Sequence, residues 1–346
     1  MTEEDTPLIS IKGLQKYFPI HGGVFYRHIG NVHAVDGISF DVRKGETIGL
    51  VGESGCGKST LGKALLHLHP PTAGTVEFEG VDIDTIPAQQ LREMRKEMQM
   101  IFQDPMESLN PRMSVGSILE EPFIIHKGEH EFDTAEKRKN EILRILHEVG
   151  LPESAYDKYP HEFSGGQRQR IGIARAIALK PKLIVCDEPV SALDVSVQSQ
   201  ILNLMVTLQK EMDLTYIFIA HNLSVVKYIA DRICVMYLGR VVEDAESQAM
   251  YEKPMHPYTQ ALISAIPEPD PVLQKEKQVL EGDVPSPIKP PSGCHFHPRC
   301  PHAREKCKVD APVLQTVDSN KSHRVACHFA EEIFATQSSE HLTRTI

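Results

Sequence analysis

The chain contains no tryptophan and no apolar run close to the roughly 20 residues that a membrane-spanning helix needs. Its start, MTEEDTPLIS, is acidic and lacks the apolar core of a secretory signal peptide. Acidic residues outnumber basic ones and give a net charge of −10, which disfavours nucleic acid as a partner. These absences predict a soluble intracellular protein.

Close cysteine pairs are also lacking. Four cysteines near the end of the chain follow a C-x5-C-x6-C-x19-C pattern: Cys294, Cys300, Cys307 and Cys327. Structural zinc sites usually contain pairs separated by two to four residues, and a reducing cytosol argues against disulfides. Two metal sites stay open at this point. The cysteines could bind zinc together with neighbouring histidines, or they could hold a [4Fe–4S] cluster, whose cysteine spacings vary more.

The hydrophobic pattern predicts an α/β fold. Short β-branched runs, among them 8–14 and 37–42, predict strands in the first hundred residues, and EKRKNEILRILHEVGL has the spacing of an amphipathic helix. Strands and helices then alternate, which is typical of a parallel sheet covered by helices. From about Ile266 the sequence is rich in proline and predicts a separate C-terminal extension. The predicted helices cover 58–68, 167–179, 195–212 and 222–229, and the later strands cover 182–189, 215–220 and 232–239.

A glycine-rich stretch between a predicted strand and helix has the P-loop pattern. Glycines let successive backbone N–H groups turn toward phosphate oxygens, and the following helix adds the positive end of its dipole. Lys58 would contact the β- and γ-phosphates, and the Ser59 hydroxyl would bind Mg²⁺. The predicted ATP-binding residues of this loop are Gly52, Glu53, Ser54, Gly55, Cys56, Gly57, Lys58, Ser59 and Thr60.

The stretch LIVCDEP is an apolar strand that ends in two acids. Such a strand would deliver Asp187 to the carboxyl edge of the sheet, where it can hold Mg²⁺ through water. Glu188 would then polarise the attacking water. We interpret Cys186 and Cys234 as small core residues.

A second helix start, FSGGQ, would also present N–H groups to an anion. It resembles the signature motif of the ATP-binding-cassette (ABC) ATPases. In that family the signature of one subunit closes over the ATP held by the other subunit of a head-to-tail dimer. The resemblance assigns this role to Ser164, Gly165, Gly166 and Gln167.

Other positions match the same family. Gln103 resembles the glutamine that senses Mg²⁺ and the γ-phosphate, and His221 resembles the switch histidine. Asp194, in SALD, resembles the D-loop aspartate at the dimer interface. The aromatic residue that stacks on adenine would be Phe18 or Tyr17, and the spacing favours Phe18. The resemblance implies a RecA-like P-loop core with an N-terminal antiparallel β part over 1–105 and 164–265. It also implies a helical subdomain over 106–163 and the extension over 266–346.

Longer stretches, including VGESGCGKSTLGKALL, QDPMESLNPRMSVGSILEEP and HPYTQALISAIP, resemble the oligopeptide/dipeptide importer ATPases, and more narrowly the second of their two unlike ATPase subunits. This resemblance implies ATP-driven peptide import at the cytoplasmic face of the membrane. It implies a homologous second ATPase, two membrane-spanning permease subunits and an extracytoplasmic solute-binding protein as partners. It also favours an iron–sulfur cluster over zinc at the four cysteines.

Three alternatives compete with peptide import. Related machinery imports nickel, glutathione or oligosaccharides. A soluble ABC ATPase acting on DNA or ribosomes would need a long coiled coil or a second cassette, and neither is present in the sequence. A regulatory nucleotide-binding module is disfavoured by the intact Glu188 and His221.

Overall fold

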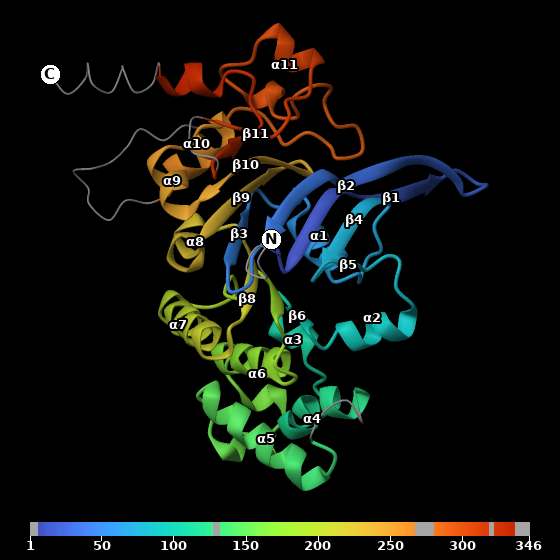
Figure 1. Ribbon diagram of the computed structural model, residues 1–346, viewed down its shortest axis with the longest axis vertical. Coiled ribbons are helices and arrows are strands. Elements are labelled where there is room, and N and C mark those ends of the chain that lie inside the picture. Colours follow the sequence, from blue (N-terminus) through green and yellow to red (C-terminus); the bar gives the residue numbers. More distant parts are fainter. Residues whose placement is uncertain (1–5, 127–131, 267–279, 318–321, 336–346) are drawn as a thin grey trace, which may run out of the picture. The chain divides into compact units, whose positions relative to one another are not determined.

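The computed structural model describes residues 6–126, 132–266, 280–317 and 322–335. The chain folds into two compact units, each assembled from separate stretches of sequence (Figure 1). Unit 1 contains residues 1–9, 42–47 and 78–220, and unit 2 contains residues 10–41, 48–77 and 221–346. Parts of the predicted extension, 267–279, 318–321 and 336–346, lie outside the described residues. The domain boundaries predicted at residues 105, 163 and 265 stay predictions.

Unit 1 contains three parallel strands in the order β8, β7, β6. They are β6 (Met98–Ile101), β7 (Leu183–Asp187) and β8 (Thr215–Ala220). Every residue of β7 and β8 is buried, which explains their unbroken apolar sequences. The helices α6 (Gly165–Ile177) and α7 (Val195–Met212) contact each other, and α6 contacts β6. The predicted parallel sheet with covering helices is therefore confirmed.

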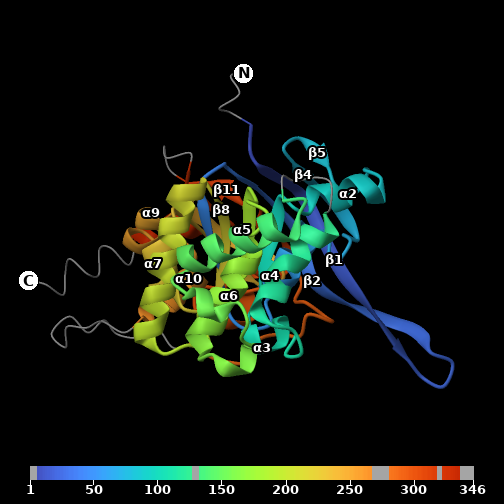
Figure 2. The ribbon, with the colours of Figure 1, turned by 90° about the horizontal axis from the view of Figure 1, so that it is seen from below.

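A group of helices lies between β6 and β7 in the chain of unit 1. The helices α4 (Val115–Ile125) and α5 (Ala135–Glu148) contact each other and α6 (Figures 1 and 2). On α5 the buried residues Ile142, Ile145 and Leu146 recur at helical spacing, as the sequence pattern predicted. The remaining short elements are β5 (Val81–Asp82), α2 (Ala88–Met94), α3 (Pro105–Ser108), η2 (Glu153–Ala155) and η3 (Pro160–Glu162).

Unit 2 begins with a long antiparallel hairpin (Figure 2). Its strands are β1 (Ile9–Gly22) and β2 (Arg27–Val42), and β4 (Ala73–Phe78) lies on the other side of β1. The sequence predicted only the apolar runs at 8–14 and 37–42 as strands, so both strands are longer than expected. Their outer halves are half-buried or exposed, and the apolar residues 17–20 of β1 include Pro19, which counts against a strand in a sequence pattern.

A second group of strands in unit 2 surrounds β9 (Arg232–Tyr237). β3 (Thr47–Val51) pairs with β9 in parallel, and β10 (Arg240–Glu246) pairs with it antiparallel. The helix α1 (Lys58–Leu65) follows β3, and it is shorter than the predicted 58–68 because His67 adopts a left-handed φ of 52°. Three further helices are α8 (Leu223–Ile229), α9 (Ser247–Glu252) and α10 (Pro257–Ser264).

The C-terminal extension continues the strands of unit 2. β12 (Arg324–Val325) pairs with β10, and β11 (Gln315–Thr316) pairs with β12. Two short helices, η5 (His297–Arg299) and α11 (Glu305–Val309), lie between α10 and β11 in the chain.

A buried carboxylate joins this extension to β10. Glu243 is fully buried and accepts hydrogen bonds from the backbone N–H groups of Met255 (2.7 Å) and His256 (2.9 Å). Nε2 of His323 lies 2.8 Å from the same carboxylate. A buried carboxylate is tolerated only with such partners, so Glu243 ties the extension to the fold of unit 2.

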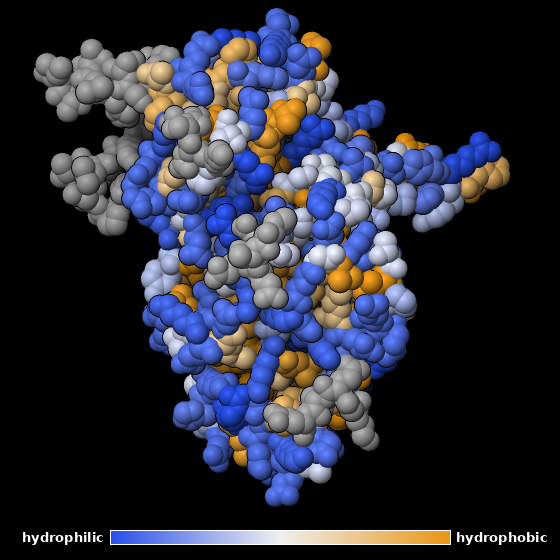
Figure 3. Space-filling view, viewed as in Figure 1, coloured by the Kyte–Doolittle hydropathy of each residue, from blue (hydrophilic) through white to orange (hydrophobic). Residues whose placement is uncertain are grey.

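The face shown in Figure 3 is mainly hydrophilic, with apolar residues in small groups. Within the described ranges, no helix combines the length and the apolar character that crossing a membrane would require.

Candidate nucleotide and cysteine sites

The P-loop lies between the end of β3 at Val51 and the start of α1 at Lys58. Its backbone demands glycine at two positions where neighbouring backbone approaches closely. A Cβ on Gly52 would lie 2.2 Å from the Met236 carbonyl oxygen, and one on Gly57 would lie 1.9 Å from that of Ala34. Both residues also have positive φ, 153° and 106°. The loop conformation is therefore fixed by tertiary contacts as well as by its own sequence.

Lys58 lies inside this loop. Its side chain is buried, and Nζ donates hydrogen bonds to the carbonyl oxygens of Gly52 (2.8 Å) and Glu53 (2.9 Å). The loop thus holds a desolvated cation among backbone groups, an arrangement suited to a polyanionic ligand. Cys56 is buried beside it, with Sγ 3.8 Å from Nζ, and burial raises the pKa of the Cys56 thiol. Cys186 and Cys234 are fully buried, which confirms their interpretation as core residues.

Two candidate catalytic residues of unit 1 meet where adjacent strands end. In the parallel pairing, Ile101 of β6 lies opposite Cys186 of β7. Two residues further on, Nε2 of Gln103 donates a 3.2 Å hydrogen bond to Oε2 of Glu188. Asp187, the last residue of β7, is buried at the same strand end. Three predicted site residues are therefore brought together by strand register.

Glu188 also has an unusual backbone conformation. Its φ of 45° is left-handed, which is uncommon for a residue with a side chain. The backbone holds it there, because its N–H donates to Ile219 (3.0 Å) and its carbonyl accepts from the Ser191 hydroxyl (3.0 Å). Strained residues of this kind gather at functional sites.

The signature motif forms a capped helix start in unit 1. Ser164 is the N-cap of α6, and its hydroxyl accepts from the Gln167 N–H while the Gln167 side chain accepts from the Ser164 N–H. The helix consequently starts at Gly165, before the predicted 167. Gly166 packs tightly against α7, since a Cβ there would lie 2.4 Å from Cγ1 of Val197. Asp194 is the N-cap residue of α7.

The remaining predicted nucleotide residues belong to unit 2. Phe18 is half-buried on β1, with Nζ of Lys16 5.1 Å from its ring centre. Tyr17 is engaged elsewhere, because its hydroxyl donates to Asp36, which also pairs with Arg240. Burial and this carboxylate raise the pKa of Tyr17 to about 12. His221 is exposed and directly precedes α8 and its N-cap residue Asn222.

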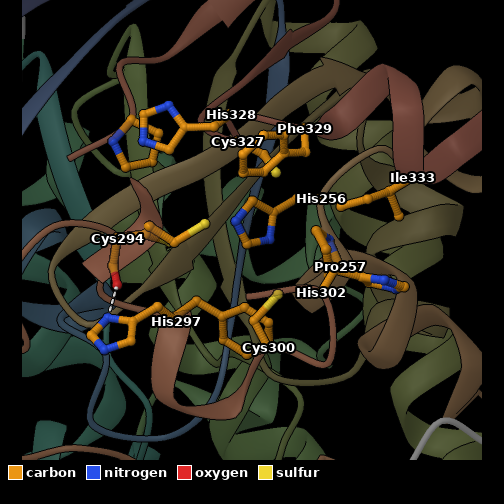
Figure 4. A pocket seen from close by; sticks show the side chains of 13 residues that line it. His256, Pro257, Cys294, His297, Cys300, His302, Cys327, His328, Phe329 and Ile333 are labelled. Carbon is orange, nitrogen blue, oxygen red and sulfur yellow. Dashed lines mark hydrogen bonds between the residues drawn. The ribbon is translucent and has the colours of Figure 1, made fainter. Parts of the chain in front are cut away.

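The four C-terminal cysteines line one cavity of about 20 Å³ (Figure 4). Residues from two other parts of unit 2 share this cavity, among them His256 at the start of α10 and Phe329 after β12. Burial and the neighbouring thiols raise the pKa of Cys300 to about 12 and that of Cys327 to about 11. Within the described part of the chain, no three His, Cys, Asp or Glu side chains converge tightly enough to hold a single metal ion.

Sequence reasoning missed the residues that anchor the P-loop. The Glu53 N–H donates to the Tyr258 hydroxyl (2.8 Å), and the Glu53 carboxylate pairs with Arg299. These partners lie 205 and 246 residues further along the chain. No local sequence pattern could have indicated them.

The P-loop, the acidic end of β7 and the capped FSGGQ helix together define an ABC-class ATPase. Residues 35–191 match the family model "ABC transporter". Residues 242–307 match "Oligopeptide/dipeptide transporter, C-terminal region".

Curated relatives agree along nearly the whole chain. The chain is 51% identical to the oligopeptide transport ATP-binding protein AppF of Bacillus subtilis, over 93% of this chain and 97% of that protein. It is 50% identical to a probable peptide ABC transporter ATP-binding protein, y4tS of Sinorhizobium fredii, over 93% of this chain and 89% of that one. The chain therefore belongs to the oligopeptide/dipeptide importer family of ABC transporter ATP-binding proteins.

Solved structures of ABC cassettes share its fold. The dimeric cassette MJ0796, in a post-hydrolysis state with ADP and Pi, superposes with a TM-score of 0.61 at 26% identity and covers 69% of this chain and 98% of that one. The cassette cbiO1 of Clostridium perfringens gives a TM-score of 0.60 at 24% identity and covers 72% of this chain and 92% of that one. Both likenesses confirm the predicted P-loop cassette fold.

Proposed function

We propose that this chain is an ATP-hydrolysing subunit that powers the import of peptides through closure of a nucleotide-bound dimer. The observation that carries the hydrolytic role is the Gln103–Glu188 hydrogen bond beside the buried Asp187. It places a carboxylate and an amide at one strand end, where a general base and a γ-phosphate sensor would act. Peptide as the solute is supported by the relatives, whose names describe oligopeptide or peptide transport.

The proposed roles divide between the two units. In unit 2, Lys58 and the N–H groups of the P-loop contact phosphates, Ser59 binds Mg²⁺, Phe18 stacks on adenine and His221 contacts the γ-phosphate. In unit 1, Gln103 and Asp187 help to hold Mg²⁺, and Glu188 is the general base for the attacking water. The signature residues and Asp194 act on the ATP of the partner ATPase. Hydrolysis of MgATP supplies the free energy. This chain binds and orients the nucleotide, and Glu188 deprotonates the attacking water.

The proposed partners are a homologous second ATPase, two membrane-spanning permease subunits and an extracytoplasmic solute-binding protein. The chain would then be a peripheral protein at the cytoplasmic face of the membrane. The assembled transporter, reconstituted in vesicles, tests this proposal. We expect uptake of labelled di- and oligopeptides that requires ATP. Uptake of nickel, glutathione or oligosaccharides without any peptide uptake would contradict the proposed solute.

We further propose that Cys294, Cys300, Cys307 and Cys327 hold a [4Fe–4S] cluster. One observation supports it: the four cysteines line one cavity. A cluster binds each thiolate at a different iron atom, so the four sulfurs need not meet at one point. Bound there, it would crosslink segments that have little apolar core of their own.

Metal analysis of an anaerobic preparation tests the cluster. We expect iron and sulfide in equal amounts and their loss in Cys300→Ser. Stoichiometric zinc without iron would contradict the proposal.

A further inference from the structure

A carboxylate inside the P-loop pairs with the C-terminal extension. The guanidinium of Arg299 donates two hydrogen bonds to Glu53, one to each carboxylate oxygen, at 2.7 and 3.1 Å. The Arg299 side chain is only 7% exposed and that of Glu53 is 28% exposed. A two-point pair with so little water around it holds the carboxylate in a defined direction.

Aromatic rings pack around Arg299. It ends η5, the turn that joins Cys294 to Cys300. Its guanidinium lies 6.0 Å from the ring centre of Tyr237, and Phe296 packs edge-on against the same ring at 5.2 Å. These buried aromatic rings leave the arginine little freedom to leave Glu53.

A second contact fixes the same loop residue. The Tyr258 hydroxyl accepts the Glu53 backbone N–H at 2.8 Å, and the Tyr258 ring packs against Phe296 at 5.4 Å. Both the main chain and the side chain of Glu53 are therefore held by residues that follow the nucleotide motifs in sequence. All of these residues belong to unit 2.

The charge of Glu53 matters because of its position. It follows Gly52 directly, in a loop whose N–H groups and Lys58 are arranged for a polyanion. A carboxylate without a cation in that loop would repel the phosphates of ATP, and the repulsion would be poorly screened at a half-buried position. Arg299 supplies the compensating charge from outside the motif.

We propose that Arg299 is a positioning residue of the nucleotide site, which neutralises Glu53 and thereby makes ATP affinity depend on the C-terminal extension. This inference rests on the proposed ATP binding. Its structural consequence is that the turn between two of the four cysteines is in direct contact with the P-loop, so a disturbance of the cysteine cavity reaches the phosphate site through one ion pair.

A double-mutant cycle that neutralises each charge in turn tests the pair. Binding of a fluorescent ATP analogue with Mg²⁺ is measured on the purified full chain for Arg299→Gln, Glu53→Gln and the double variant. We expect Arg299→Gln to weaken binding about tenfold, because the carboxylate loses its cation. Glu53→Gln should tighten binding about threefold, since Arg299 then faces the phosphates without a counter-charge. The double variant should return close to the wild-type affinity.

Lys308→Gln is the control, because Lys308 pairs with Glu305 in the same extension and both side chains are largely exposed. It should leave ATP affinity unchanged. Thermal unfolding without nucleotide identifies a variant that fails to fold. If Arg299→Gln fails to fold, Glu53→Gln still tests whether loss of the carboxylate tightens ATP binding. If the wild type binds and Arg299→Gln binds equally well, or the double variant is as weak as Arg299→Gln, the inference is overturned. A wild type that does not bind ATP overturns the proposed function as well.

Discussion

The side-chain amide of Gln103 donates a 3.2 Å hydrogen bond to the carboxylate of Glu188. Strand register explains this contact: Ile101 and Cys186 are paired on adjacent parallel strands, and each site residue follows its strand partner by two positions. The carboxyl ends of neighbouring parallel strands coincide, so residues that are 85 apart in sequence meet there.

Replacing Glu188 with Gln should lower the rate of ATP hydrolysis by roughly two to four orders of magnitude, because the base is lost while its shape is kept. ATP binding should persist, so the dimer with the partner ATPase should accumulate in ATP and be visible by size-exclusion chromatography. Glu211→Gln, on the exposed side of α7, is the control. Undiminished turnover in Glu188→Gln would contradict the proposed role.

Replacing Gly166 with Ala should damage the signature helix. The new Cβ would lie 2.4 Å from Val197, and relief of such a clash typically costs about 1–3 kcal/mol. We expect a lower free energy of unfolding in urea and reduced ATPase activity of the dimer. Gly172→Ala on the same helix meets no atom within 4 Å and should instead stabilise the fold by up to about 1 kcal/mol. Equal effects of the two changes would refute this explanation.

Replacing Phe18 with Ala should weaken ATP binding about tenfold, since stacking of an aromatic ring on a base contributes about 1–3 kcal/mol. Phe18→Trp should retain most of the affinity. Tyr17→Phe removes only the hydroxyl that donates to Asp36 and should leave affinity unchanged. Titration with a fluorescent ATP analogue measures all three, and undiminished affinity in Phe18→Ala would contradict stacking by Phe18.

His256 should make the fold sensitive to mild acid. Burial lowers the pKa of His256 from 6.5 to about 3, and its Nδ1 accepts the Tyr258 N–H at the start of α10. Between about pH 3 and pH 6.5, His256 binds a proton in the unfolded chain but not in the folded chain. Stability from this group is therefore complete above pH 6.5 and is lost as the pH falls, by up to about 1.4 kcal/mol per pH unit.

The variant His256→Asn keeps a capping acceptor but cannot take up the proton. We expect its free energy of unfolding to fall less than that of the wild type between pH 7 and pH 5, as measured by urea denaturation. An equal loss of the free energy of unfolding in the two proteins would show that His256 does not cause the pH dependence.

The nucleotide motifs and the regular elements around them were determined by local sequence. The helix predicted over 195–212 and the strand over 215–220 are observed with the same bounds, because an amphipathic period and a short apolar run are local signals. The P-loop and the FSGGQ helix start could be recognised for the same reason: their residue types and spacing are dictated by backbone geometry within a few residues.

Tertiary structure alone decided which distant groups meet. The outer half of the β1–β2 hairpin was missed, since its strands are specified by pairing with each other. The pairs Arg299–Glu53 and His323–Glu243 join residues 246 and 80 apart. Side-chain contacts at such separations depend on how strands and turns pack, and packing depends on the whole chain. The sequence therefore specified the chemistry of the phosphate site, and the fold determined that the C-terminal extension holds one of its residues in place.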